Sequence, residues 1–356
     1  MTDLPRHHGS FSPGYLAGVP LSQGMLTAAR AIGESKGRQD LYARQAPGVL
    51  ETLRPVAQVQ SIESSNRIEG VVAPPDRLQA LVAQKTTPVN RSEQEIAGYR
   101  DVLSDIHANA ANIVLTSGVV LQLHRDLFAF LPGSGGAWKS ADNVIVDRRP
   151  DMPDITRFTP VPAAFVPSAM DDLHAGFATV VGGHVVDPLV GIGAYVLDFL
   201  CIHPFLDGNG RMARLLTLLL LYQAGYEVGR YVSLERIIEA SSETYYEALQ
   251  ASSEGWHDSS HDLRPWLEYF FGVIVAAYKE LETRVGTVTG GRGYKRRMII
   301  DCVGRLPDEF RVGDVERVCS GIPRPTINRV LAQLRDAGQL ESSGRGRDAA
   351  WKKLGK

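Results

Sequence analysis

The 356-residue sequence has little of what marks secreted or membrane proteins. Its three cysteines, Cys201, Cys302 and Cys319, are too few and too far apart for a disulfide framework or metal-ligand spacing, which is typical of a reducing compartment. The longest apolar run, 215–222, is too short to cross a bilayer, and the N-terminus shows no basic-then-apolar signal segment. We therefore expect a cytoplasmic protein without a membrane partner.

The sequence also lacks the alternation of strands and helices that a doubly wound sheet requires, and it has no internal repeat. Apolar residues recur instead at helical spacing, which predicts an all-α fold. Residues 1–20, rich in Gly, Pro and Ser, are expected to be an extended arm, and 132–167 a long loop or hairpin. Helices are expected over 21–34, 41–67, 76–85, 92–112, 117–131 (capped by Ser117), 168–181, 187–202, 209–224, 233–254 and 262–285.

Charge is unevenly distributed along a chain whose formal net charge is only −2. Residues 290–356 contain 15 Lys and Arg against 8 Asp and Glu, whereas the rest contains 23 against 32. The tail therefore has a different surface, and we expect it to be a separate domain. The sequence predicts an N-terminal helical region over 1–114, a helical core over 115–285 and a basic domain over 290–356.

The most informative stretch is "HPFLDGNGRMAR" at 203–214, between two segments that are apolar on most faces. Two glycines permit a sharp loop that leads into a helix N-terminus, where free backbone N–H groups and the helix dipole attract anions. Arg211 and Arg214 share one face of the first helical turn, and Asp207 adds a carboxylate. This combination predicts a polyphosphate site with Mg²⁺. The alternative is a solvated loop whose arginines pair with surface acids, which the buried flanking helices disfavour.

The same stretch resembles the Fic family motif, His-x-Phe-x-Asp/Glu-Gly-Asn-Gly-Arg-x-x-Arg, at every specified position. The resemblance covers roughly 50–285 and implies a Fic-type helical core, over 115–285, with a small β-hairpin flap. It also implies transfer of AMP from ATP to a Ser, Thr or Tyr hydroxyl of a target protein. One departure is Val196, where many relatives carry histidine; we expect this position to lie within the helix, away from the substrate.

The resemblance implies a role for each residue of the motif. His203 would be the general base that accepts the proton of the incoming hydroxyl, a role suited to a side chain that titrates near neutrality. Phe205 would point inward and anchor the loop. The remaining residues would bind Mg²⁺ (Asp207), cradle the phosphates (Gly208, Asn209 and Gly210), contact the α- and β-phosphates (Arg211) and reach the γ-phosphate (Arg214).

A second stretch, "ESSNRIEGVV", precedes the motif. Gly70 is expected to close a helix, so Glu69 lies in the unfavourable field at the helix C-terminus and needs a cationic partner or water. The stretch also matches the Ser/Thr-x-x-x-Glu-Gly/Asn inhibitory motif of Fic proteins. That match implies an inhibitory helix around 55–69, in which Ser65 and Glu69 belong to the motif. Glu69 would pair with Arg214 in place of the γ-phosphate, leaving ATP in an unproductive pose.

The resemblance assigns the irregular segment 132–167 to the flap, which would align an extended target segment by strand addition. The flap strand is expected at 143–149, where the residues nearest the nucleotide would be Val144, Ile145, Val146 and Asp147. The alternative is a structural loop. Backbone pairing reads little side-chain chemistry, so this segment does not identify the target.

The stretch 233–257 resembles the part of Fic proteins that forms the adenine pocket. Tyr245 would flank the base, and Ser253 occupies a position that is often Asn, so a hydrogen bond to the ring would be weaker or water-mediated. Alternatively, Tyr245 and Tyr246 are ordinary core aromatics. His257 and His261 have no third ligand in evidence, and we expect them to be surface histidines.

The tail predicts short helices over 295–306, 311–319 and 323–340 and a β-wing over 341–354. That order resembles a winged helix-turn-helix, with the helix that begins near Pro325 in the recognition position. The basic residues Arg324, Arg329, Arg345 and Arg347 suit a phosphate backbone, which makes duplex DNA a candidate partner of 290–356. The alternative is a protein-docking or dimer module.

Autoinhibited AMP transfer is thus the function that the sequence favours, and three alternatives remain open. The loop could hold the nucleotide reversed and transfer the γ-phosphate, or the enzyme could remove AMP under the control of Glu69. In the third, the chain is a DNA-binding regulator that uses its Fic core as a nucleotide sensor. Self-modification and a homodimer also remain open.

Overall fold

The computed structural model describes residues 9–45, 47–131, 133, 135–147, 155–290, 293–319, 322–343 and 350–354. Its described residues are mostly helical, as the sequence predicts. The chain divides into two compact units, one formed by 1–34 and 56–278 and the other by 35–55 and 279–356. None of the described helices is both long and apolar enough to cross a membrane.

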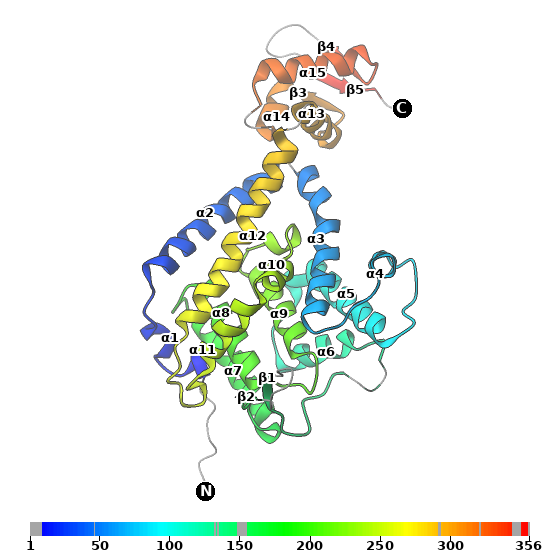
Figure 1. Cartoon of the computed structure of the whole chain (residues 1–356). Helices are drawn as coiled ribbons and strands as arrows, with labels where there is room; N and C mark the ends of the chain where they lie inside the picture. The colour runs from blue at the N-terminus through cyan, green and yellow to red at the C-terminus, as the bar shows by residue number, and fades with distance from the viewer. Residues whose placement is uncertain are drawn as a thin grey trace. The chain divides into compact units, whose positions relative to one another are not determined.

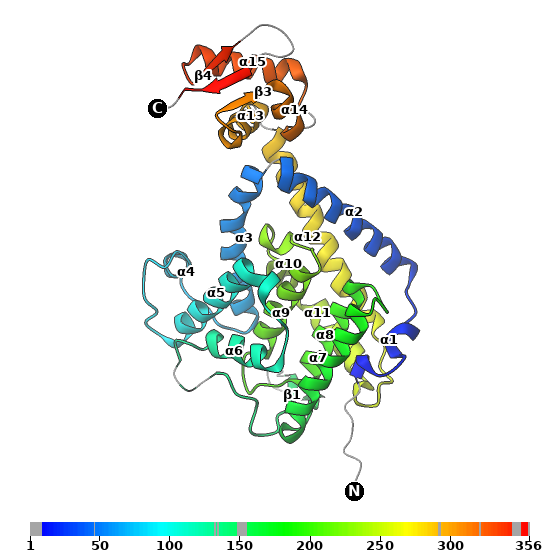
Figure 2. The same ribbon diagram turned by 180° about the vertical axis from the view of Figure 1, so that it is seen from behind.

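Helices make up nearly all of the first unit (Figures 1 and 2). Three of them, α2, α3 and α12, continue into the second unit. The segment predicted as one helix over 233–254 is two helices, because the chain breaks at Ser241. The helices are α1 (Tyr15–Gly18), α2 (Gln23–Gln45), α3 (Pro47–Ile68), α4 (Pro75–Val82), α5 (Arg91–Asn109), α6 (Ser117–Leu127), α7 (Val166–Gly182), α8 (Pro188–Ile202), α9 (Asn209–Gln223), α10 (Leu234–Ala240), α11 (Ser242–Ser253) and α12 (Arg264–Gly290).

Helices α8 and α9 form the centre of this unit, as their apolar sequences predict. Nearly every residue of both helices is buried. The two helices pack against each other, with α7 on α8 and α5 on α9 (Figure 1). Because both helices are fixed by packing on several sides, the short connection between them is held at a defined place in the core.

The N-terminal segment departs from the expected extended arm. Residues 9–18 form a short 3-10 helix, Gly9–Phe11, followed by α1. Ser10 is buried, and its backbone N–H and hydroxyl both donate to the buried Asp198 carboxylate of α8, at 2.8 and 2.6 Å. The prediction for 9–18 was wrong because this carboxylate fixes the segment. The cap of α6 is also one residue earlier than predicted: Thr116 accepts from the Val119 N–H.

The expected flap is a two-stranded antiparallel hairpin of β1 (Ile145–Asp147) and β2 (Ile155–Phe158). Val146 pairs with Thr156, but Ile145 pairs with Phe158. The pairing therefore skips Arg157, which forms a β-bulge. The predicted strand over 143–149 begins two residues later than expected, and 148–149 lie outside the described residues.

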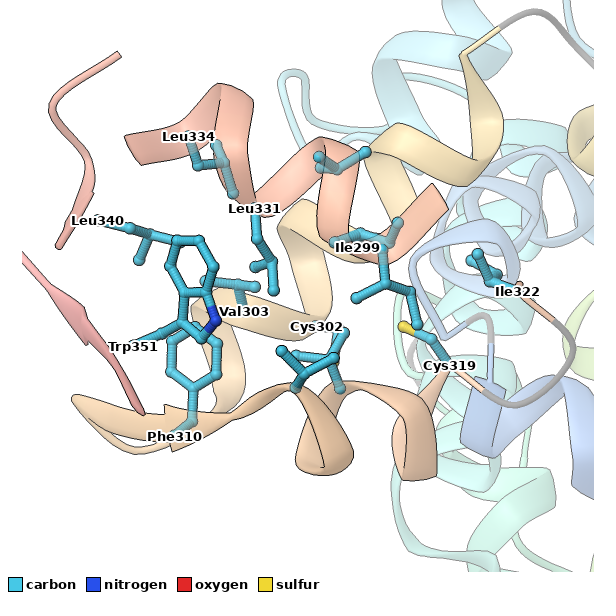
Figure 3. Packing of buried hydrophobic residues seen from close by; sticks show 14 residues of the cluster. Ile299, Cys302, Val303, Phe310, Cys319, Ile322, Leu331, Leu334, Leu340 and Trp351 are labelled. Atoms are coloured by element: carbon cyan, nitrogen blue, oxygen red, sulfur yellow. The ribbon is translucent and has the colours of Figure 1, made fainter. Parts of the chain in front are cut away.

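The second unit includes α13 (Tyr294–Arg305), β3 (Glu309–Arg311), α14 (Val312–Val318), α15 (Arg324–Asp336), β4 (Leu340–Ser343) and β5 (Ala350–Lys353). The strands form an antiparallel sheet in the order β3-β5-β4. Figure 3 shows the buried cluster between helices and sheet, which includes Ile299, Phe310, Leu331 and Trp351. The three expected helices and the terminal strands are present, β3 was not expected, and Arg345 and Arg347 lie outside the described residues. Assignment to the winged-helix class stays a prediction.

Candidate active site

The loop between α8 and α9 begins at His203, whose backbone is left-handed, with φ 51° and ψ 62°. This conformation costs a residue other than glycine about 1–3 kcal/mol, so the surroundings must hold it. Lys139 contributes on both sides: its backbone N–H donates to Pro204 O at 2.8 Å, and its ammonium lies 3.5 Å from Ile202 O. Lys139, which the sequence analysis did not single out, therefore fixes the position of His203.

His203 is held as a neutral imidazole with one nitrogen available. Its Nδ1 lies 3.3 Å from the Leu200 carbonyl oxygen. Because a carbonyl can only accept, Nδ1 carries the proton and Nε2 keeps its lone pair. Burial lowers the pKa of His203 to about 4, and the nearby Lys139 ammonium acts in the same direction. At neutral pH Nε2 is therefore free to accept a proton, but with a pKa of about 4 the ring is a weaker base than the titration near neutrality expected from the sequence.

A second histidine, His124 of α6, packs against the loop. Phe205 is fully buried and stacks on His124 of α6, with ring centroids 3.6 Å apart. The Gly136 N–H donates to His124 Nδ1, so Nε2 carries the proton and donates to the Asp207 backbone oxygen at 3.1 Å. Burial lowers the pKa of His124 to about 4. No spacing in the sequence distinguishes His124 from a core histidine, so its place beside the loop was not predicted.

Asn209 and Gly208 complete the turn into α9. The Asn209 side chain accepts from Phe205 N and donates to Phe205 O, at 2.9 and 2.8 Å, so its amide closes the loop. Gly208 has φ 84°, and a Cβ there would lie 2.9 Å from the Phe128 ring. The contribution of this turn to an anion site is therefore its backbone N–H groups at the start of α9, not the Asn209 side chain.

Arg211 is buried and paired. Its guanidinium donates to Glu95 of α5 at 2.6 Å and lies 5.2 Å from the centroid of the Phe128 ring. The Asp207 carboxylate is more than half exposed, and it lies 3.5 Å from Arg211 and 3.4 Å from Arg91. Among the described residues, no group of three or more His, Cys, Asp or Glu could hold a metal ion. A single exposed carboxylate fits Mg²⁺ that is also bound by phosphate oxygens.

Arg214 meets the predicted acidic partner. It is 4% exposed and donates to Glu69 Oε1 at 2.7 Å, to Ser65 Oγ at 2.8 Å and to Ser65 O at 2.9 Å. Burial is the largest single influence and opposes the charge on Arg214, but attraction from Glu69, Tyr245 and Tyr99, together with the hydrogen bond to Glu69, outweighs it and raises the pKa of Arg214. Gly210 is required for this approach, because a Cβ there would lie 2.1 Å from Glu69 Oε1. Gly70 has the expected positive φ, 75°.

His203, Gly210, Arg214 and Glu69 line one cavity of about 350 Å³. Its walls come from the α8–α9 loop, the end of α3, the flap hairpin and α11. The lining residues are Glu69, Ile145, Val146, Arg157, Phe158, Leu197, Leu200, Cys201, His203, Gly210, Arg214, Tyr245, Tyr246, Leu249, Gln250 and Ser253.

The core of this site matches a known protein family. Residues 114–221, which include α6 to most of α9 with the flap between them, match the Fic/DOC family. This segment is a Fic domain. A protein adenylyltransferase, fic-1 of Caenorhabditis elegans, is 29% identical over 151 residues. That match spans 42% of this chain and about a quarter, 25%, of the worm protein.

Solved structures extend the likeness of fold beyond the Fic domain. A Fic family protein from Desulfovibrio desulfuricans G20 superposes with a TM-score of 0.62 at 24% identity, covering 95% of this chain and 98% of that one. A Fic domain-containing signaling protein from Bacteroides thetaiotaomicron gives 0.59 at 19% identity, over 70% and 95% of the two chains. Residues 134–508 of worm Fic-1 give 0.59 at 18%, over 74% and 73%.

Beside the Fic domain, α11 supplies the tyrosines that the sequence singled out. Tyr245 is 4% exposed, lines the cavity and packs on Trp266 and Tyr269. Tyr245 therefore lines the cavity, as a residue of an adenine pocket would, and also packs among core aromatic side chains. Tyr246 and Ser253 also line the cavity.

On the flap of the Fic domain, the predicted residues differ in position. Ile145 and Val146 line the cavity, whereas Val144 does not and is 52% exposed. The Asp147 side chain lies outside what the structure describes. Arg157 and Phe158, on the second strand, also line the cavity and were missed, because the sequence pattern indicated only the first strand.

The two histidines expected at the surface differ in burial. His257 is exposed, as predicted. His261 is 5% exposed and its Nε2 lies 2.9 Å from Ser10 Oγ, so that prediction was wrong. Its partner comes from a segment more than two hundred residues away in sequence, which a local pattern cannot reveal.

Helix α3, which precedes Glu69, is fastened to the unit by α10. Ser61 donates to the buried Glu235 carboxylate at 2.7 Å, and Tyr99 donates to it at 3.1 Å. Arg67 pairs with Glu239, one turn further along α10, at 3.1 Å on the surface. One helix thus holds α3 by one buried and one exposed contact, and neither was anticipated.

Proposed function

We propose that this protein is an autoinhibited protein adenylyltransferase, which transfers AMP from ATP to a Ser, Thr or Tyr hydroxyl of a target protein. The observation that carries the proposal is the single cavity shared by His203, the start of α9, Arg214 and Glu69. A neutral base, an anion-binding helix end and an arginine together suit chemistry on a nucleotide phosphate. The name of the worm relative, a protein adenylyltransferase, supports the same activity.

In the proposed reaction, the target hydroxyl oxygen attacks the α-phosphorus of ATP. His203 Nε2 accepts the hydroxyl proton as the new O–P bond forms. The bond between the α-phosphorus and the bridging oxygen breaks, and that oxygen leaves with pyrophosphate. Backbone N–H groups at the start of α9 bind phosphate oxygens, since they have no intrahelical acceptors.

Asp207 is the residue that would hold Mg²⁺ next to the phosphates. When bound, the ion neutralises phosphate charge. The Asp207 side chain is exposed, and His124 holds the backbone oxygen of the same residue. The carboxylate is therefore accessible to an ion while its backbone is held in place.

Arg211 and Arg214 would each contact phosphate through a guanidinium that is paired with a glutamate. To contact the α- and β-phosphates, as the family resemblance implies, Arg211 would have to bind phosphate while it still donates to the buried Glu95 at 2.6 Å. Arg214 would instead have to exchange Glu69 for the γ-phosphate. Arg214 lines the cavity and Arg211 does not, so we assign the inhibitory contact to the Arg214 pair.

Glu69 would inhibit by occupying the position that the γ-phosphate needs. The carboxylate approaches Gly210 at the start of α9 and binds Arg214, so ATP bound beside it would be displaced from the productive pose. A hundredfold repression requires a preference of about 2.7 kcal/mol for the inhibited state. An ion pair between the partly exposed Glu69 and the buried Arg214, which also donates to Ser65, can supply that preference.

The test uses the Glu69→Gly protein with ATP labelled separately at the α- and γ-phosphates, incubated with Mg²⁺ and cell lysate or alone. His203→Ala in the same background is the matched control. Label transferred to protein only from the α-phosphate, absent in the control, is the expected result. Transfer only from the γ-phosphate would mean that the nucleotide lies reversed and the enzyme is a kinase.

A lack of transfer from either position, with ATP still bound, would contradict the proposal in another way. The Fic core would then serve in AMP removal or as a nucleotide sensor. Deletion of 290–356 separates those outcomes: loss of biological function on deletion, with function retained in His203→Ala, would indicate a DNA-binding regulator.

A further inference from the structure

We propose that Arg157, on the second strand of the flap, is a cationic ligand for the phosphate chain of the nucleotide. The inference rests on the proposed function, because it adds a residue to the same cavity. Arg157 lies outside the motif that begins at His203, and its contribution follows from the backbone and charge around it.

The β-bulge directs the side chain of Arg157. In a regular strand, neighbouring residues point to opposite faces. Arg157 and Phe158 are neighbours, yet both line the cavity. The register explains this: Val146 pairs with Thr156 and Ile145 with Phe158, so the extra residue Arg157 is turned out of the alternation.

Phe158 keeps the hairpin in place while Arg157 reaches inward. The Phe158 ring stacks on His257 at 5.3 Å and meets Trp256 edge-on at 6.4 Å. The Arg157 guanidinium lies 5.1 Å from the centroid of the Tyr246 ring on α11, across the cavity. This contact holds the guanidinium against one wall but leaves its N–H donors directed elsewhere.

The Nε–H group of Arg157 is a hydrogen-bond donor that an anion could satisfy. Its Nε is shielded from solvent, and no described residue accepts a hydrogen bond from it. A shielded guanidinium N–H without an acceptor is unfavourable, whereas a phosphate oxygen would satisfy it with a charge-assisted hydrogen bond.

The charges around the cavity favour an anion. The described part of the lining contains one carboxylate, Glu69, and two guanidiniums, Arg157 and Arg214. Glu69 is already paired with Arg214, and the pKa of His203 is lowered to about 4, so that imidazole is neutral at pH 7. Among the described residues that line the cavity, Arg157 is therefore the charged side chain without a partner of opposite charge. Because Arg157 does not depend on the release of Glu69, it can bind phosphate in the inhibited state too.

The experiment measures the affinity of the full chain for ATP and for adenosine by calorimetry, in the presence of Mg²⁺. Arg157→Gln is expected to weaken ATP binding by about tenfold or more, the effect of losing one charge-assisted hydrogen bond, and to leave adenosine binding unchanged. Arg157→Lys, which keeps the charge without the planar fork, should lie between the two. Thr156→Ala is the matched control, because Thr156 is exposed on the same strand and does not line the cavity.

An equal loss of ATP and adenosine affinity would place Arg157 at the base and overturn the inference. Unchanged ATP affinity in both Arg157 variants would also overturn it. If Arg157→Gln does not fold, the ATP affinity of Arg157→Lys decides the question. Labelled AMP transfer by Glu69→Gly is scored separately. Unchanged ATP affinity with transfer intact removes only the role of Arg157, whereas no ATP binding by the unaltered chain removes the proposed function as well.

Discussion

Arg211 and Arg214 lie three residues apart on α9, and each pairs with a glutamate from another helix or its end, but the two pairs differ in what surrounds them. Arg211 and Glu95 are 1% and 5% exposed and lie outside the cavity. Arg214 is 4% exposed, but Glu69 is 33% exposed and both line the cavity. A ligand can therefore replace Glu69, whereas Glu95 is closed into the structure. Under the proposed function, the Arg211–Glu95 pair is structural and the Arg214–Glu69 pair, one turn further along α9, is regulatory.

Removal of Glu95 should produce the largest effect, on stability. Glu95→Ala leaves the buried Arg211 with the 3.5 Å contact to Asp207 as its ion pair among the described residues, and an uncompensated buried charge costs about 3–5 kcal/mol. Urea unfolding of the variant and the unaltered chain measures the difference. A loss below about 1 kcal/mol would show that Arg211 finds another partner and that the two pairs are not distinct in kind.

Acid should destabilise the first unit, because four of its histidines are held neutral by burial. Burial lowers the pKa of His124, His174, His203 and His261 to about 4, from 6.5. Between pH 6.5 and 4 the unfolded chain therefore binds more protons than the folded one, and stability falls as pH falls. Asp198 has the opposite effect, because burial raises its pKa from 3.8 to about 7. Between those pH values the folded chain holds one proton that the unfolded chain releases, which partly offsets the loss of stability.

Each net proton is worth about 1.4 kcal/mol of stability per pH unit. Urea midpoints at pH 7.5, 6 and 5 measure the slope, and His124→Gln should reduce it. A midpoint that stays constant or rises below pH 6.5 would contradict the neutral state inferred for these rings.

Glu69→Gly should have the opposite profile to Glu95→Ala. The partly exposed Glu69 is replaced by water when it is removed, so we expect stability to change by about 1 kcal/mol or less. AMP transfer should rise about a hundredfold, which corresponds to about 2.7 kcal/mol. Urea unfolding and α-labelled ATP measure the two quantities on the same preparation. A large loss of stability without a gain in transfer would make Glu69 a structural residue like Glu95.

Glu235 should act through α3 rather than at the cavity. In Glu235→Gln, the hydrogen bonds from Ser61 and Tyr99 lose their charged acceptor, which weakens the attachment of α3 and should raise transfer about tenfold. In a Glu69→Gly background the same change should raise transfer no further, because there is no inhibitory contact left to release. A fall of activity in both backgrounds would mean that Glu235 only supports the fold.

The sequence predicted the part of the site that is local in the chain. The α8–α9 loop follows from apolar helices, Pro204, two glycines and a dense motif, and Gly70 from its place after a helix. The residues that it missed act from a distance. Lys139, Glu95 and Glu235 are ordinary charged residues until folding places them beside the loop or α3.

Fold elements missed by the sequence have the same origin. Residues 9–11 contain Gly and Ser, which favour an irregular chain, and they became ordered only because Asp198 of α8 accepts from Ser10. The bulge at Arg157 arises from the way in which β1 pairs with β2. The sequence of either strand alone does not determine that register.

The smallest effect should come from the exposed contact of α3 with α10. Glu239 lies one turn from Glu235 and pairs with Arg67 at 3.1 Å, but the two side chains are 47% (Arg67) and 23% (Glu239) exposed, and Arg67 also pairs with Glu63. Exposed ion pairs of this kind contribute about 0.2–1 kcal/mol, so Glu239→Gln should change AMP transfer by less than about threefold. Measured beside Glu235→Gln, it is a matched control on the same helix. If Glu239→Gln released inhibition as strongly as Glu235→Gln, α10 as a whole would hold α3, and burial would not be what separates a regulatory contact from an incidental one.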